Sequence, residues 1–194
     1  MNRLFRGLAA AALLIFVGSV SAAQPAKPLP SDSIYQLPLP LTTSQGQTRD
    51  WRSLRGKPQL ISMFYTSCQF VCPLIIETGK AVERQLTPDQ QKRLGITFIS
   101  MDPARDTSVA LKNMADKRKL DPARWTLASP KASDVRAAAG VLGIRYRQLA
   151  DGEFNHTSVV ILVDAEGRIL ARSEKIGSKP DPAFVAEVRK AIGG

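Results

Sequence analysis

Two apolar segments of strand length constrain the fold of this chain most: "PQLISMFY" (58–65) and "GITFISM" (95–101). Their apolar residues do not alternate with polar ones, as expected of strands buried on both faces. A helical pattern follows each segment, over residues 73–86 and 106–120. Alternating strands and helices predict an α/β fold in which helices cover both sides of a sheet.

The remaining patterns extend this alternation along the chain. They predict strands at 34–41, 48–51, 125–129 and 144–149, a helix at 132–143, a hairpin of 157–164 with 168–173, and a closing helix at 181–192. Ligands of open α/β sheets bind at the carboxyl ends of the strands. Residues that follow the two buried strands are therefore the first candidates for a functional site.

The N-terminus has the three-part layout of a secretory signal. Arg3 and Arg6 precede an apolar run, and small residues follow it up to position 23. We expect residues 1–23 to be removed and the protein to be periplasmic; the alternative is an uncleaved anchor in the inner membrane, because the run approaches the length of a spanning helix. Residues 24–33 are predicted to be a Pro-rich tether, and 34–194 a single domain.

The formal net charge of +10 favours acidic partners or surfaces. Nucleic acid is a poor candidate, because an exported chain does not meet it, the basic residues are dispersed, and aromatic residues make up only 6%. The densest basic run, at 112–120, is predicted to be a solvated helix face.

The only two cysteines, Cys68 and Cys72, are separated by three residues in "TSCQFVCPLI". This spacing is neither that of a thioredoxin motif nor that of a zinc ribbon. An oxidising compartment favours a disulfide, but closing so short a loop would stabilise the fold by only about 2 kcal/mol. If a helix begins near Cys68, both sulfurs lie on one face of it, and the helix N-terminus favours the thiolate form that binds metals and attacks disulfides.

The single histidine, His156, precedes the predicted hairpin. A loop histidine is commonly just solvated. In a thioredoxin-like arrangement, however, this loop faces the cysteine loop, so that two thiolates and an imidazole converge. That donor set suits three-coordinate Cu(I), or zinc with a water molecule.

Three motifs together make the chain similar to the Sco/SenC family, periplasmic or mitochondrial assembly factors for the copper centre of cytochrome c oxidase. They are "TSCQFVCP" (66–73), "ISMDPARDT" (99–107) and "NHTSVVILVDAEG" (155–167), and the resemblance covers roughly residues 34–192. It implies a thioredoxin-like three-layer fold with a central mixed sheet flanked by helices.

The resemblance also implies that Cys68, Cys72 and His156 are copper ligands. The commonest family motif has Pro and Asp directly after the first cysteine, where this chain has Gln69 and Phe70. Because that carboxylate is missing, we expect the site to bind Cu(I) rather than Cu(II).

Four further residues allow two interpretations each. Asp102 and Asp106 could act as an acid and a base, or could be ordinary strand-end and helix-cap residues. The resemblance implies that Asp102 lies near the copper site, where it could serve partner docking. Met63 and Met101 could be thioether ligands, although methionine on a buried strand is usually part of the core.

Three functions fit these residues. The first is a copper chaperone that passes Cu(I) to a dithiol of the copper-receiving oxidase subunit, its own thiols being reduced by a thioredoxin-like donor. The second is a thiol-disulfide reductase, with Cys68 and Cys72 catalytic, that keeps the oxidase cysteines reduced. Thioredoxin-like reductases place a cis-proline where this chain has 155–157, "NHT", which favours metal binding. The third, a peroxide-reducing enzyme, has no support beyond Cys68.

Overall fold

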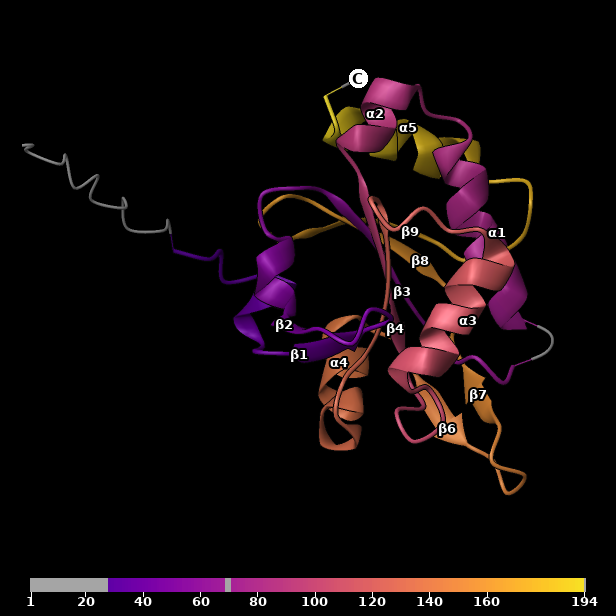
Figure 1. The fold of residues 1–194 in the computed structure, drawn as a ribbon. Helices are drawn as coiled ribbons and strands as arrows, with labels where there is room; N and C mark the ends of the chain where they lie inside the picture. The colour runs from indigo at the N-terminus through magenta and orange to yellow at the C-terminus, as the bar shows by residue number, and fades with distance from the viewer. Residues whose placement is uncertain (1–27, 69–70, 194) are drawn as a thin grey trace, which may run out of the picture.

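The computed structural model describes residues 28–68 and 71–193, and Figure 1 shows their arrangement. The predicted signal, at 1–23, lies outside the described residues. Strands and helices alternate as expected. The strands are β1 (Pro40–Thr43), β2 (Thr48–Asp50), β3 (Gln59–Phe64), β4 (Gly95–Ser100), β5 (Trp125–Ser129), β6 (Tyr146–Gln148), β7 (Phe154–His156), β8 (Val160–Val163) and β9 (Ile169–Ser173); the helices are α1 (Val71–Glu83), α2 (Pro88–Lys92), α3 (Ser108–Arg118), α4 (Val135–Val141) and α5 (Pro182–Ala191).

Seven strands form one mixed sheet in the order β2-β1-β5-β4-β3-β8-β9, and β6 and β7 form a separate two-stranded ribbon. At the centre, β3 pairs in parallel with β4 and antiparallel with β8. Every residue of β3 and β4 is buried, because α1 and α3 lie on one side of the sheet and α4 on the other (Figure 1). This arrangement confirms the predicted α/β fold of three layers around a mixed sheet.

Close packing of α1 on the sheet depends on Gly79. A Cβ atom at this position would lie 2.6 Å from the Trp125 ring of β5. The Trp125 ring in turn packs edge-on against Phe98 of β4, with ring centroids 5.3 Å apart. Burying a large apolar side chain such as these stabilises a fold by about 1.5–3 kcal/mol. The contact fixes the distance between α1 and the sheet, and with it the position of the cysteine motif.

The N-cap of α3 is Thr107, whose hydroxyl accepts a hydrogen bond from the Ala110 N–H. Asp106, which the sequence allowed as a helix-cap residue, does not take this role. Asp106 is instead buried, with 1% of its surface exposed, and its carboxylate faces the cysteine loop. A threonine cap leaves that carboxylate free for tertiary contacts.

The strand predicted at 34–41 is wrong over most of its length. Residues Ile34–Gln36 form a 3-10 helix capped by the Ser33 hydroxyl, and only its end belongs to β1. The helix predicted at 132–143 begins as a 3-10 turn, Ala132–Asp134, and ends at Val141. The sequence patterns missed α2 and β7 altogether.

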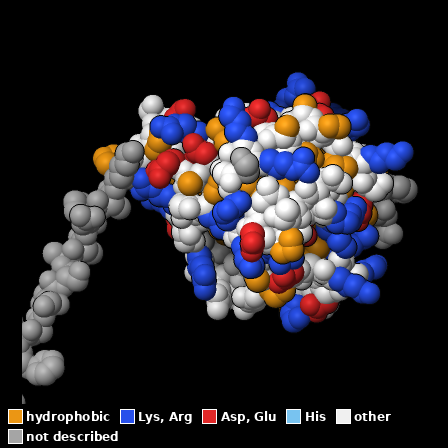
Figure 2. Space-filling view, turned by 90° about the horizontal axis from the view of Figure 1, so that it is seen from above, with side chains coloured by type: hydrophobic (Ala, Val, Ile, Leu, Met, Phe, Trp, Pro, Cys, Tyr) orange, Lys and Arg blue, Asp and Glu red, His pale blue; other side chains and the backbone are white. Residues whose placement is uncertain are grey.

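Part of the predicted tether contacts the domain. Leu29 packs against the core, and the Ser33 hydroxyl donates a 2.5 Å hydrogen bond to the Glu166 carbonyl. Lysine and arginine side chains are dispersed over the face shown in Figure 2 and are interspersed with acidic ones. In the described part of the chain, no helix combines the length and the apolar character needed to cross a bilayer.

Candidate metal centre

The candidate site lies where β3 and β4 end. The loop that leaves β3 carries Cys68, and Asp102 follows β4 closely, as the rule for open sheets predicts. The β6–β7 ribbon, which carries His156, lies at the same end of the sheet (Figure 1). Three segments that are distant in sequence therefore meet at one edge.

Both cysteines are buried, and they are not joined in a disulfide. Cys72 is the second residue of α1 and is fully buried, whereas Cys68 precedes the helix. The Cys72 N–H donates to the Cys68 sulfur at 3.5 Å, and the Tyr65 N–H donates to the Cys72 sulfur at the same distance. The expected helix thus starts later than Cys68, but its N-terminal amide still points at the first sulfur.

His156 is brought to Cys72 as predicted. Its Nε2 lies 4.0 Å from the Cys72 Sγ, and its Nδ1 lies 3.1 Å from the Thr157 carbonyl oxygen. An Nδ1–H donated to that carbonyl leaves the Nε2 lone pair directed at the sulfur, which is the tautomer a metal ligand needs. Typical zinc bonds to sulfur and imidazole sum to about 4.3 Å, so a small ion fits between these two atoms.

The described residues do not contain three His, Cys, Asp or Glu side chains grouped closely enough to hold a metal ion as they stand. The three-ligand set of Cys68, Cys72 and His156 therefore stays a prediction. The geometry brings one sulfur, that of Cys72, to 4.0 Å from the His156 Nε2. The second sulfur, that of Cys68, accepts a hydrogen bond from the backbone N–H of Cys72.

Burial controls the protonation of these donors. Burial raises the pKa of the Cys72 thiol. The hydrogen bond from the Tyr65 N–H lowers this pKa in part, and the neighbouring Cys68 raises it further. The expectation that the helix N-terminus lowers this pKa is wrong for Cys72, because desolvation of a fully buried thiol outweighs the helix dipole. Burial likewise lowers the pKa of His156, which the hydrogen bond to Thr157 offsets in part. A neutral imidazole is the form that binds metals.

A family profile described as SCO1/SenC matches residues 29–193. The chain belongs to the SCO1/SenC family. A curated relative, the SCO1 protein homolog of Bacillus subtilis, is 22% identical over 193 residues, which is 97% of each chain. This agreement over nearly the whole length confirms the resemblance that the three motifs indicated.

Two solved structures extend the comparison. ScoI of Bradyrhizobium japonicum, solved with copper bound, is 26% identical with a TM-score of 0.65 over 80% of this chain and 98% of that one. BsSco, described as having a disulfide switch and as a member of the Sco family of cytochrome c oxidase assembly proteins, has a TM-score of 0.68 at 20% identity, over 80% and 92% of the chains. This SCO1/SenC protein therefore has the fold of the family.

Tyr65 connects the ribbon of this family member to the central sheet. Its hydroxyl donates to the Glu153 carboxylate at 2.9 Å and accepts from the Phe154 N–H at 3.3 Å. Its ring packs edge-on against Phe154 and His156, with centroid distances of 5.1 and 6.0 Å. No sequence pattern singled out Tyr65; the available signal was its position at the end of the predicted strand 58–65, directly after β3.

Asp106 holds the start of the cysteine loop. Its carboxylate accepts from the Thr66 N–H at 3.1 Å, from the Thr66 hydroxyl at 2.5 Å, and from the Ser100 hydroxyl of β4 at 2.5 Å. Burial raises the pKa of Asp106, and these hydrogen bonds oppose the shift. Because both carboxylate oxygens are engaged, the geometry supports the structural interpretation of Asp106.

Asp102 is buried and forms an ion pair with Arg105. The Arg105 guanidinium also donates to the Gly152 carbonyl at 2.6 Å and lies 3.6 Å from the Glu153 carboxylate. Asp102 thus reaches the ribbon through Arg105. Met63 is fully buried in β3, and Met101 is 2% exposed beside a cavity next to the ribbon.

Proposed function

We propose that this protein is a periplasmic copper chaperone that binds one Cu(I) through Cys68, Cys72 and His156 and delivers it to the copper centre of cytochrome c oxidase. The observation that carries the proposal is the 4.0 Å distance between the Cys72 Sγ and the His156 Nε2 at a buried, reduced cysteine pair. Family membership and the copper-bound relative support copper as the ion.

The donor chemistry fits this cargo. Two thiolates and a neutral imidazole are soft ligands that suit Cu(I). Since burial keeps the Cys72 thiol protonated, the incoming ion must displace the proton, and binding is coupled to proton release. Delivery then proceeds by ligand exchange, in which thiolates of the recipient subunit replace those of this protein one at a time.

The exchange requires both sulfurs to be reduced. In an oxidising compartment free thiols tend to form a disulfide, which offers no thiolate to a metal. We therefore propose that a thioredoxin-like reductant acts on this protein before each round of copper loading. The predicted signal at 1–23 supports export, with an inner-membrane anchor as the alternative if that segment is retained.

One observation favours a second candidate function, a thiol-disulfide reductase acting on the oxidase cysteines. The Cys72 N–H donates to the Cys68 sulfur, and such a bond stabilises a nucleophilic thiolate. In that function Cys68 and Cys72 are catalytic and His156 is dispensable. The two functions therefore differ in what they require of one side chain.

Copper affinity tests the chaperone directly. Reduced protein is titrated with Cu(I) under anaerobic conditions against a chromophoric Cu(I) chelator, and one ion is expected to bind. Cys72→Ser should abolish tight binding, and His156→Ala should weaken it by a large factor. Asn155→Ala is the matched control, because Asn155 is exposed on the same strand. Undiminished affinity in Cys72→Ser would refute the three-ligand site.

A cellular experiment separates the two candidates. Oxidase activity is measured under limiting copper in strains that carry His156→Ala or Cys68→Ser, and each purified variant is assayed for reduction of a disulfide substrate. For a chaperone, His156→Ala impairs the oxidase and leaves disulfide reduction unchanged. If the oxidase stays normal with His156→Ala but fails with Cys68→Ser, the reductase is the correct function.

A further inference from the structure

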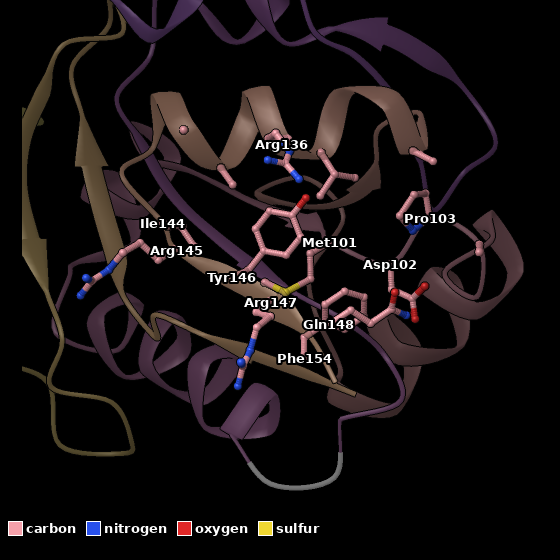
Figure 3. A pocket seen from close by; sticks show the side chains of 15 residues that line it. Met101, Asp102, Pro103, Arg136, Ile144, Arg145, Tyr146, Arg147, Gln148 and Phe154 are labelled. Carbon is pink, nitrogen blue, oxygen red and sulfur yellow. The ribbon is translucent and has the colours of Figure 1, made fainter. Parts of the chain in front are cut away.

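A cavity of about 700 Å³ lies beside the candidate metal centre, between the β6–β7 ribbon, α4 and the segment that follows β4. Its walls are partly apolar, and the residues that matter for its chemistry are Met101, Arg136, Arg145, Tyr146, Arg147 and Phe154. In Figure 3 the Arg136 guanidinium reaches toward the Tyr146 ring from one side. The sulfur of Met101 lies near the same ring on the other side. The cavity therefore combines an apolar floor with a basic rim.

The three arginine side chains of this cavity are unpaired within the described residues. The side chains of Arg136, Arg145 and Arg147 make no hydrogen bond or ion pair among residues 28–68 and 71–193, although other arginines such as Arg55 and Arg124 do. Across that same part of the chain, Arg118 is the one other arginine side chain that lacks such a partner. Three of the four arginine side chains without such a partner in the described residues thus lie at one cavity.

The acidic groups nearby do not neutralise this charge. Asp102 lines the cavity, but its carboxylate is paired with Arg105. The ribbon's own Glu153 is taken up by Tyr65 and Arg105. The guanidinium groups therefore stay available to carboxylates from outside the chain, which form bidentate pairs with arginine.

The cavity is contiguous with the metal centre through two shared rings. Phe154 lines it and packs on Tyr65, while Tyr146 lines it and pairs across the ribbon with His156. A second hollow of about 360 Å³ adjoins the ribbon and is lined by Arg145, Arg147 and His156 among others. A ligand that lies along the ribbon therefore reaches from the arginines to the imidazole.

We propose that the ribbon and its cavity form a docking site for an extended acidic segment of the copper-exchange partner, one that carries apolar side chains between its carboxylates. Carboxylates pair with the three arginines, and an apolar side chain enters the cavity over Met101, Tyr146 and Phe154. The docked segment holds the partner's thiols next to His156. The proposal rests on the proposed function for the identity of the partner, but the docking chemistry rests on the cavity alone.

A peptide segment fits the evidence better than a small anion does. Arg145 and Arg147 belong to the ribbon segment, which adjoins both hollows, and Arg136 lies across the first one on α4, so the arginines do not converge on one point. Figure 3 shows Arg145 and Arg147 extending outward from the ribbon while Arg136 reaches over the cavity. Several separated carboxylates match this distribution, as expected for electrostatic complementarity between partners.

Binding of a defined peptide tests the site. The probe is a blocked, fluorescein-labelled peptide of alternating aspartate and leucine, and its binding to the reduced full chain is followed by fluorescence anisotropy. The native protein should bind it with an affinity that falls as salt rises. The variant with Arg136→Gln, Arg145→Gln and Arg147→Gln should bind it about tenfold more weakly or worse.

Matched controls separate this site from general charge. Lys117→Gln, Lys175→Gln and Lys179→Gln together remove the same charge from exposed positions elsewhere, and should leave peptide affinity unchanged. A peptide with asparagine for aspartate, or glycine for leucine, should bind more weakly than the probe. Equal losses in the arginine and lysine variants would overturn the proposal.

Other occupants give distinct results. Citrate that displaces the peptide at equal concentration would show a small-anion site, and vesicles of anionic lipid that displace it would show a membrane surface; either result refutes a peptide site. If the triple variant does not fold, the pair Arg145→Gln and Arg147→Gln serves, since both residues are exposed. Cu(I) affinity is measured in parallel: native protein that binds Cu(I) but not the peptide refutes the docking site and leaves the proposed function standing.

Discussion

Replacing Asp106 by alanine should destabilise the domain by about 3 kcal/mol. The carboxylate accepts hydrogen bonds from the Thr66 N–H, the Thr66 hydroxyl and the Ser100 hydroxyl. Each buried donor left unpaired costs about 1–3 kcal/mol. The hydroxyl of Thr66 can turn toward solvent because Thr66 is only half-buried, so we count the Thr66 N–H and the Ser100 hydroxyl. A loss of this size is a large part of a typical domain stability of about 5–15 kcal/mol.

Asp106→Asn is the matched variant. The asparagine keeps an oxygen for Thr66, and its amide can donate to the Ser100 hydroxyl, so the expected loss is about 1 kcal/mol. Urea unfolding of the reduced apoprotein, followed by tryptophan fluorescence, gives both values provided that the slope with urea is unchanged. The argument is refuted if Asp106→Ala costs less than Asp106→Asn, or if the two cost the same.

Three further predictions follow from the packing and the site. Gly79→Ala should destabilise the fold by about 1–3 kcal/mol in thermal unfolding, because the new Cβ meets Trp125 at 2.6 Å; Gly140→Ala, whose Cβ meets nothing within 4 Å, should instead be neutral or stabilising by up to about 1 kcal/mol. Tyr65→Phe keeps the ring contacts but loses the hydrogen bonds to Glu153 and Phe154, so amide exchange should accelerate in the ribbon and not in β3; equal acceleration in both contradicts the role assigned to the hydroxyl. Oxidised protein should take up no Cu(I) in the chelator competition, and equal uptake by both redox forms excludes the cysteines as ligands.

The central strands could be predicted from sequence because their environment is uniform. Both 58–65 and 95–101 are mainly apolar without alternating polar residues, and both form strands that are buried on each face. The segment 34–41 has a similar composition, but the Ser33 hydroxyl caps the Tyr35 N–H and turns the chain into a 3-10 helix. Apolar periodicity does not report such a local side-chain hydrogen bond.

The candidate site was predictable in part for a comparable reason. The topology of an α/β sheet brings the residues after β3 and β4 to one edge, so the neighbourhood of Cys68 and Asp102 followed from strand order. The protonation of Cys72 did not, because burial of the thiol outweighs the effect of its helix position. The roles of Tyr65 and Asp106 depend on partners far away in the sequence, at Glu153 and Thr66.

The placement of His156 on a separate ribbon has a kinetic consequence. The cysteine motif is tied to β3, an interior strand of the seven-stranded sheet, whereas the strands of the ribbon pair only with each other. Local opening of such a small peripheral unit requires far less free energy than unfolding the sheet. In the proposed copper site the imidazole can therefore leave while both sulfurs stay in place, and we expect the lifetime of a bound ion to follow the opening rate of the ribbon rather than the global stability of the domain.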